Sequence, residues 1–114
     1  MKFKGERKDT LSIGLLHANV GSRIEHEPYA PCTINDLRSA NMDMWLLGHI
    51  HKPEVIGKEP FMLYPGNIQG RHINEDGPRG CYFITVDANQ KISYEFKPVQ
   101  NIVWKCEDVN IEKA

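Results

Sequence analysis

Apolar residues occur along this chain in short runs bounded by polar or turn-forming residues. Continuous runs at residues 11–16, 44–47 and 61–64 have the length of buried strands. Two further runs, at residues 81–86 and 92–96, alternate apolar and polar positions across a short polar turn. Alternation puts every second side chain on one face, so these runs predict an antiparallel hairpin that extends a sheet or packs on it.

A helix is predicted between the first two runs. Thr33 with Asp36 three residues later is a capping-box-like start. Ile34, Leu37 and Met42 then recur at helical spacing and form an apolar stripe. A strand, a crossover containing a helix and a second strand make a βαβ unit, in which the strands are expected to be parallel. The pattern predicts an α/β fold that consists mostly of strands.

Histidines stand directly after the first two runs. His17 ends the first, and the second ends in Gly48-His49-Ile50-His51. Ligand sites in open α/β sheets lie beyond the carboxyl ends of the strands, so all three imidazoles are expected at one edge. Side chains two apart in an extended segment point to the same side, so His49 and His51 are expected to face one pocket. Because neutral imidazole is the commonest metal ligand, this edge is a candidate metal site. A surface strand with exposed histidines is the alternative.

Neighbouring positions refine this prediction. Gly48 has no Cβ, so a ligand or another backbone can come close there. Asp43, just before the second run, is expected to be structural. His26 lies between two glutamates in a polar loop and is expected to be solvated.

The segment at residues 68–80 is polar and glycine-rich. Long connections of this kind are often functional. Its cationic or protonatable residues Arg71, His72 and Arg79 are candidates for hydrogen bonds to substrate phosphates, and a merely solvated basic loop is the alternative. A last strand is predicted at residues 102–106.

Composition limits the possible functions. The chain has 114 residues, which indicates one domain at most, and its 40% hydrophobic and 25% charged residues are ordinary for a soluble globular protein. A net charge of −1 gives no global attraction to nucleic acid, so contact with DNA would need a local patch. No apolar run approaches the roughly 20 residues of a membrane span. Cys32, Cys81 and Cys106 have no CxxC spacing, which predicts reduced, buried thiols and a cytoplasmic location.

Three stretches between Ile13 and Val86 carry a resemblance to a known family. They read GLLHANVG, DMWLLGHIHKPEV and YPGNIQGRHINEDGPRGCYFITVD. A histidine after one strand, Gly-His-x-His after the next and a Tyr-Pro-Gly-Asn turn before a glycine-rich loop resemble the calcineurin-like metallophosphoesterases. Within that family, the sequence looks most like the SbcD-like DNA-repair exonuclease branch. The resemblance implies part of a four-layer α/β/β/α sandwich, with a βαβ unit followed by β-hairpins.

The resemblance also implies a chemistry. Enzymes of this family bind two divalent ions, typically Mn²⁺, which polarise a phosphodiester and generate a hydroxide for in-line attack. His17 and His49 match ligands of one ion, and His51 matches a ligand of the other. DNA is the implied substrate, and an ATPase subunit is a possible partner. The candidate substrate-binding residues lie in or beside the glycine-rich loop: Asn67, Arg71, His72 and Arg79.

The family's other metal motifs are absent from these 114 residues, namely Asp-x-His, Gly-Asp and Gly-Asn-His-Asp. We therefore expect a carboxy-proximal piece of a phosphoesterase domain that is inactive alone. Residues 1–10 would be a polar lead-in, 11–98 the second half of the domain, and 99–114 a last strand and linker towards a cap domain. The alternatives are a small-molecule phosphatase, or a non-catalytic module that pairs with a second copy through an exposed sheet edge.

Overall fold

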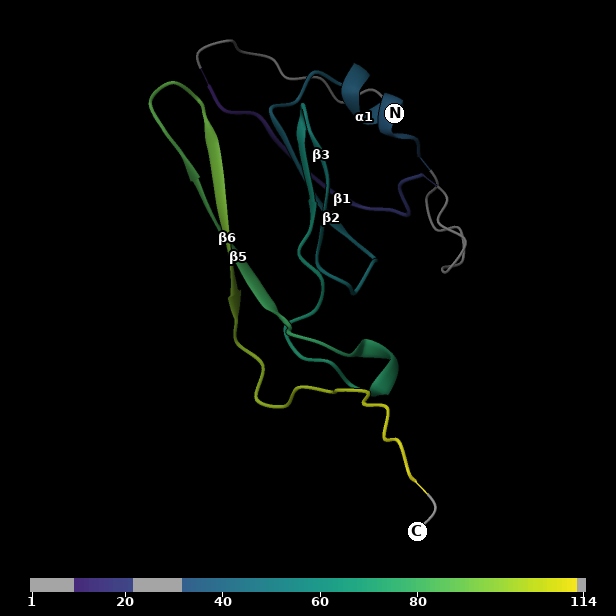
Figure 1. The fold of residues 1–114 in the computed structure, drawn as a ribbon. Coiled ribbons are helices and arrows are strands. Elements are labelled where there is room, and N and C mark those ends of the chain that lie inside the picture. Colours follow the sequence, from purple (N-terminus) through teal and green to yellow (C-terminus); the bar gives the residue numbers. More distant parts are fainter. Residues whose placement is uncertain (1–9, 22–31, 113–114) are drawn as a thin grey trace.

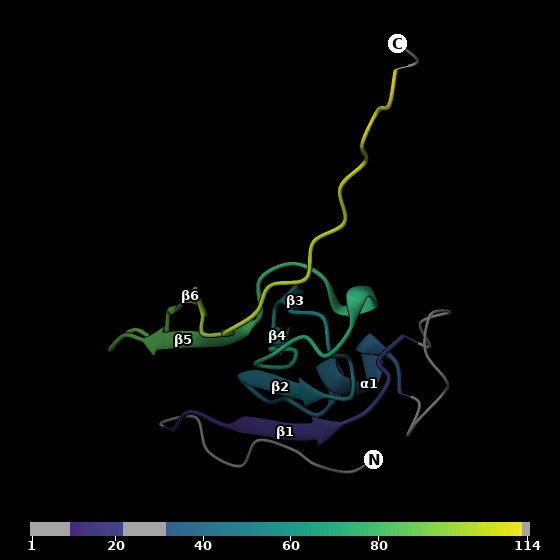
Figure 2. The ribbon, with the colours of Figure 1, turned by 90° about the horizontal axis from the view of Figure 1, so that it is seen from below.

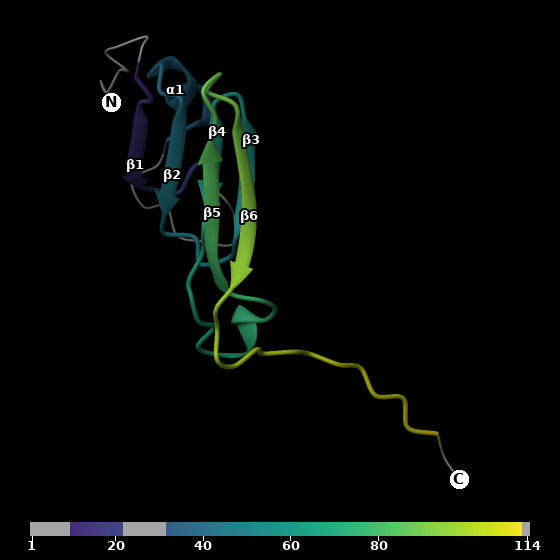
Figure 3. The ribbon, with the colours of Figure 1, turned by 90° about the vertical axis from the view of Figure 1, so that its left-hand side faces the viewer.

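The computed structural model describes residues 10–21 and 32–112. Its main sheet has four strands in the order β1-β2-β4-β3 (Figure 3). β1, β2 and β4 are parallel neighbours, and β3 pairs antiparallel with β4. The strands are β1 Ile13–His17, β2 Met44–Gly48, β3 Glu54–Lys58 and β4 Phe61–Tyr64. The three continuous apolar runs therefore form strands, and the predicted parallel pairing of the first two is confirmed.

Helix α1, Ile34–Ser39, lies between β1 and β2 in the chain and begins with the predicted capping box. The Thr33 hydroxyl accepts from the Asp36 N–H at 3.1 Å, and the Asp36 carboxylate accepts from the Thr33 N–H at 2.8 Å. Leu37 is fully buried, and its carbonyl accepts from the indole N–H of Trp45 at 3.1 Å. These contacts hold α1 on one face of the main sheet.

The opposite face of the main sheet carries the predicted hairpin, formed by β5 Gly80–Val86 and β6 Ile92–Pro98. Its inward side chains, Ile84 among them, pack on Met44 and Phe61 of the main sheet. The layers are therefore helix, sheet and hairpin (Figures 1 and 3). This mixed α/β structure, mostly β, is the predicted fold class, and the described residues supply three layers of the expected sandwich.

Asp43 has the structural role expected from the sequence. Its carboxylate accepts from the Ser12 N–H at 2.7 Å, and its own N–H donates to the Ser12 carbonyl at 2.9 Å. This reciprocal pair joins the starts of β1 and β2, and so contributes to the register that brings their carboxyl ends to the same level.

The segment after β6 contains no strand in residues 99–112, so the strand predicted at residues 102–106 is wrong. The chain first crosses the glycine-rich loop and then leads away from both sheets (Figure 2). The apolar residues of this segment led to the strand prediction, but its hydrogen bonds go to the glycine-rich loop instead of to a neighbouring strand.

We call residues 99–104 the strap. Gln69 donates to the Ile102 carbonyl at 2.8 Å, and Trp104 donates from its indole to the Gly70 carbonyl at 3.0 Å. The Trp104 carbonyl accepts from the Gly77 N–H at 2.9 Å. The strap therefore closes the glycine-rich loop near both of its ends.

All three cysteines are free, as the sequence predicted. The prediction that they are buried is wrong for Cys81 and Cys106, which are exposed. Cys81 occupies an outward position of β5, and Cys106 lies beyond the strap, so neither faces the core.

Strand β1 forms an exposed apolar edge. It pairs with β2 on one side, and within the described residues no strand pairs with its other side. Ile13 and Leu15 are 47% and 76% exposed. Leu15 is in register with Leu46, which packs towards the hairpin. The hairpin, however, lies over β4 and β3 and leaves β1 to the side (Figure 3).

Within the described part of the chain, no helix has the length and apolar character needed to cross a bilayer.

Self-association through this edge is a testable expectation, because an unpaired apolar strand favours pairing with a second copy. The chain is expected to scatter light as a dimer, and Leu15→Glu is expected to give monomers of unchanged thermal stability. Phe83→Glu, at an exposed apolar position of the hairpin, is the matched control and should remain dimeric. A wild-type chain that is strictly monomeric would contradict the expectation.

Candidate metal centre

His17 and His49 lie together where β1 and β2 end. His17 is the last residue of β1 and stands in register with Gly48. The imidazole centroids of His17 and His49 are 5.3 Å apart, with an interplanar angle of 74°. A Cβ on Gly48 would lie 2.8 Å from Nδ1 of His17, closer than real contacts allow, so glycine leaves the space that the His17 ring occupies. The structure thus brings these two candidate ligands to one sheet edge.

The backbone bends at His49. Strand β2 ends at Gly48, and His49 has φ of 100°, a conformation that costs a residue with a Cβ on the order of 1–3 kcal/mol. The segment is therefore not a regular extended strand at His49, and a pocket shared by His49 and His51 stays a prediction. Ile50 points into the core at 3% exposure, and His51 lines a pocket that His49 does not line.

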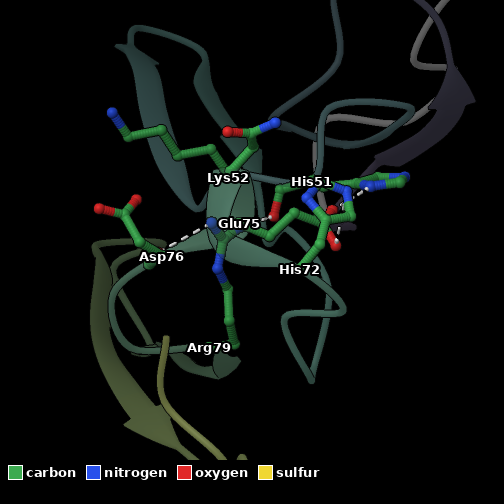
Figure 4. A pocket seen from close by; sticks show the side chains of 7 residues that line it. His51, Lys52, His72, Glu75, Asp76 and Arg79 are labelled. Carbon is green, nitrogen blue, oxygen red and sulfur yellow. Dashed lines mark hydrogen bonds and ion pairs between the residues drawn. The ribbon is translucent and has the colours of Figure 1, made fainter. Parts of the chain in front are cut away.

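His51 is hydrogen-bonded to Glu75. Its Nδ1 lies 2.7 Å from Oε2 of Glu75 (Figure 4). Glu75 ends the short 3₁₀ helix η1, Ile73–Glu75, inside the glycine-rich loop. The Glu75 side chain is 8% exposed and the His51 side chain 52%, so a buried carboxylate holds a half-exposed imidazole.

Further donors converge on the Glu75 carboxylate. The Asn67 side-chain amide donates to Oε2 at 3.0 Å, and the Arg71 backbone N–H donates to Oε1 at 3.0 Å. Burial favours the neutral acid and raises the pKa, but hydrogen bonds from His51 and Arg71 and the nearby charges of His51 and His72 outweigh it. Together they lower the pKa of Glu75 from 4.5 to about 2. Glu75 is therefore ionised at neutral pH.

Two of the four predicted substrate-binding residues hold the loop in place. Arg79 is 4% exposed, and its guanidinium donates to the carbonyls of His51 at 2.5 Å and Asp76 at 2.9 Å and to the Asn67 side chain at 3.3 Å. Asn67 also donates its backbone N–H to the His51 carbonyl at 2.9 Å. Both residues thus dock the loop on the segment after β2, and their contact with substrate stays a prediction.

The other two predicted residues are open to solvent. The side chains of Arg71 and His72 are 69% and 57% exposed. His72 lies at a pocket of about 440 Å³, whereas Arg71 does not line it. Lys52, which sequence reasoning did not single out, adds a cation to this pocket directly after His51. The lining is otherwise polar or charged throughout: His51, Lys52, His72, Asn74, Glu75, Asp76 and Arg79 (Figure 4).

The structure places the candidate ligands in two groups, and neither group by itself is a full set of metal ligands. His17 and His49 present paired imidazoles, and His51 has Nε2 available because Nδ1 is engaged by Glu75. Transition metals take at least three or four ligands. Within residues 10–21 and 32–112, no group of three or more His, Cys, Asp or Glu side chains is arranged to hold an ion.

Glu75 is the functional candidate that sequence reasoning missed. The sequence does show an acidic residue in the loop, between the residues predicted to bind phosphate. Nothing in its spacing distinguishes it from Asp76 next to it, however, and only the fold turns Glu75 inward and Asp76 towards the pocket.

Imidazoles at the ends of adjacent parallel strands, with a third oriented by a loop carboxylate, are features of a metal-dependent hydrolase centre. The chain is similar to a protein described as an uncharacterized metallophosphoesterase, YhaO of Bacillus subtilis strain 168. The two are 44% identical over 103 residues, which cover 90% of this chain and 25% of YhaO. The likeness to this metallophosphoesterase therefore runs over nearly the whole of the present chain. The chain spans about a quarter of the length of this relative. No family model matches the chain.

Proposed function

We propose that this chain carries part of the metal centre of a phosphodiesterase, and that the whole protein is a DNA-repair exonuclease. The observation that carries the proposal is the division of the three histidines. His17 and His49 pair at 5.3 Å, while His51 is held separately by Glu75 at 2.7 Å. Two groups of candidate ligands fit a centre for two ions, and the similarity to a metallophosphoesterase supports phosphoester hydrolysis as the activity of the whole protein.

The proposal gives each candidate site residue a role. His17 and His49 donate to one ion, and His51 donates to the other through Nε2. Ions bound there would supply Lewis acidity towards a phosphodiester and lower the pKa of the attacking water. Arg71, His72 and Lys52 present exposed donors near His51, where they can form charge-assisted hydrogen bonds to phosphate oxygens.

The finer parts of the proposal are Mn²⁺ as the metal, DNA as the substrate, an ATPase subunit as a possible partner and a cytoplasmic location. With a net charge of −1, the chain relies on these local donors for any attraction to DNA, so binding is expected to weaken strongly with salt.

Metal binding by the chain is the first test. Calorimetric titration with Mn²⁺ is expected to show weak binding to the wild-type chain, because the residues that the structure describes form no full set of ligands. His49→Ala is expected to abolish the binding that the His17 pair provides. His72→Ala, which removes an exposed imidazole from the same surface, is the matched control and should bind as the wild type does. Equal binding by all three proteins would contradict the proposed ligands.

Activity completes this test. With Mn²⁺ added, the 114-residue chain is expected to hydrolyse neither single-stranded DNA nor p-nitrophenyl phosphate esters. Robust turnover would show that no further ligands are needed. For the whole protein, preference for single-stranded DNA supports the exonuclease, and preference for the small esters supports a phosphatase.

A further inference from the structure

Among the acidic residues that the structure describes, Glu75 is the one that is buried, and its carboxylate meets two N–H donors and the ring nitrogen of His51. Oε2 accepts from the Asn67 amide at 3.0 Å and lies 2.7 Å from Nδ1 of His51. Oε1 accepts from the backbone N–H of Arg71 at 3.0 Å. A carboxylate in this setting acts only as an acceptor.

The state of the His51 ring follows from this geometry. Since the carboxylate supplies no proton, Nδ1 must carry the hydrogen that joins them. In the neutral ring, Nε2 then bears the lone pair. His51 is 52% exposed, so packing alone does not fix the ring, and the hydrogen bond to Glu75 sets its orientation.

We propose that Glu75 is a positioning residue that holds His51 as the Nδ1–H tautomer and directs its Nε2 lone pair towards a divalent cation. This inference rests on the proposed function for the identity of the cation. It adds a residue to the site, a second-layer carboxylate that raises the basicity of the ligand and fixes its direction.

The loop around Glu75 is built to keep the carboxylate in place. The Gly70 backbone lies against Glu75: a Cβ on Gly70 would be 2.4 Å from the Glu75 carbonyl. The strap holds the same glycine through Trp104, whose indole donates to the Gly70 carbonyl at 3.0 Å. Gln69 fixes the neighbouring turn by accepting from the Asn101 N–H at 3.0 Å. Glu75 is thus anchored independently of His51.

Nitrogen-15 NMR of the imidazole rings in the metal-free chain tests the proposal directly, because the two tautomers have different ring-nitrogen shifts. At alkaline pH, where the ring is neutral, the wild-type chain is expected to show His51 with protonated Nδ1 and unprotonated Nε2. Glu75→Ala is expected to remove this preference. Glu75→Gln keeps a neutral acceptor in the same shape and should retain part of it.

Asp76→Asn is the matched control, since it removes one negative charge from the same pocket without removing a contact to His51. It is expected to leave the His51 tautomer unchanged. Mn²⁺ affinity should fall about 10- to 100-fold in Glu75→Ala and remain near the wild-type value in Asp76→Asn.

An Nε2–H tautomer in the wild-type chain would overturn the proposal, and so would an unchanged tautomer in Glu75→Gln and Glu75→Ala. The wild-type spectrum needs no variant to fold, so the test stands even if Glu75→Ala unfolds the loop. The two proposals fail separately. If Glu75→Ala loses the tautomer preference but the wild-type chain binds no Mn²⁺, the metal site is contradicted and the positioning role stands. If Mn²⁺ binds with an affinity that does not depend on Glu75, the metal site stands and the positioning role is contradicted.

Discussion

Gly66→Ala is expected to destabilise the chain by about 2 to 5 kcal/mol. Gly66 has φ of +76°, where a residue with a Cβ pays roughly 1–2 kcal/mol. A Cβ there would also lie 2.4 Å from the His51 carbonyl oxygen and 2.8 Å from the Pro53 nitrogen. Both are backbone atoms that cannot rotate away, and overpacking of this kind costs about 1–3 kcal/mol more. The free energy of unfolding, measured by urea titration, checks the sum.

Gly77→Ala separates the two causes. Gly77 has φ of +78°, almost the value of Gly66, but a Cβ there would meet nothing within 4 Å. It should therefore cost only about 1–2 kcal/mol, the conformational part. Equal losses in the two variants would show that the clash with the segment after β2 is absent. Because Gly66 precedes the docking residue Asn67, Gly66→Ala should also displace His51 and lower Mn²⁺ affinity.

Tyr64→Phe is expected to destabilise the chain by about 2 to 4 kcal/mol. Tyr64 is fully buried at the end of β4, and its hydroxyl donates to the Ala18 carbonyl at 2.7 Å and accepts from the Val20 N–H at 2.9 Å. A buried polar group left without its partner costs about 1–3 kcal/mol. Removing the hydroxyl leaves two backbone groups shortly after His17 without their partner, the Ala18 carbonyl and the Val20 N–H.

Tyr94→Phe is the control, because Tyr94 is 44% exposed on the hairpin and its hydroxyl can bond to water. It should unfold at the wild-type urea concentration. Tyr64→Phe should also shift the ring resonances of His17, since the turn that follows His17 loses its anchor. A Tyr64→Phe variant as stable as the wild type would mean that water replaces the hydroxyl.

Sequence patterns predicted most of the scaffold because each signal was local. The capping box of Thr33 and Asp36 depends on residues three positions apart, and the strands depend on runs of apolar residues. His17 was placed correctly beside β2 because parallel strands end at one edge. The strand predicted at residues 102–106 failed because its hydrogen bonds go to a loop some thirty residues earlier, as with Gln69 and Ile102.

Long-range contacts also explain what was missed in the site. Glu75 is 24 residues from His51 in the chain, and no periodicity relates the two. Because of its charge, Arg79 was predicted to contact phosphate. In the structure it is 4% exposed, and its guanidinium donates to a backbone carbonyl and to the Asn67 side chain. Residue type made the loop a functional candidate, but only the fold distinguishes the residues that build it from those that face solvent.

The left-handed backbone at His49 gives the two histidines of Gly-His-x-His different neighbours. On a straight strand, a His-x-His doublet would offer both rings to one ion. Here the bend sends the first ring to His17 and leaves the second for Glu75. Placing the Gly-His-x-His sequence on another strand would therefore not reproduce this arrangement of the two rings. The graft would need the bend, the histidine on the neighbouring strand and the carboxylate of the loop.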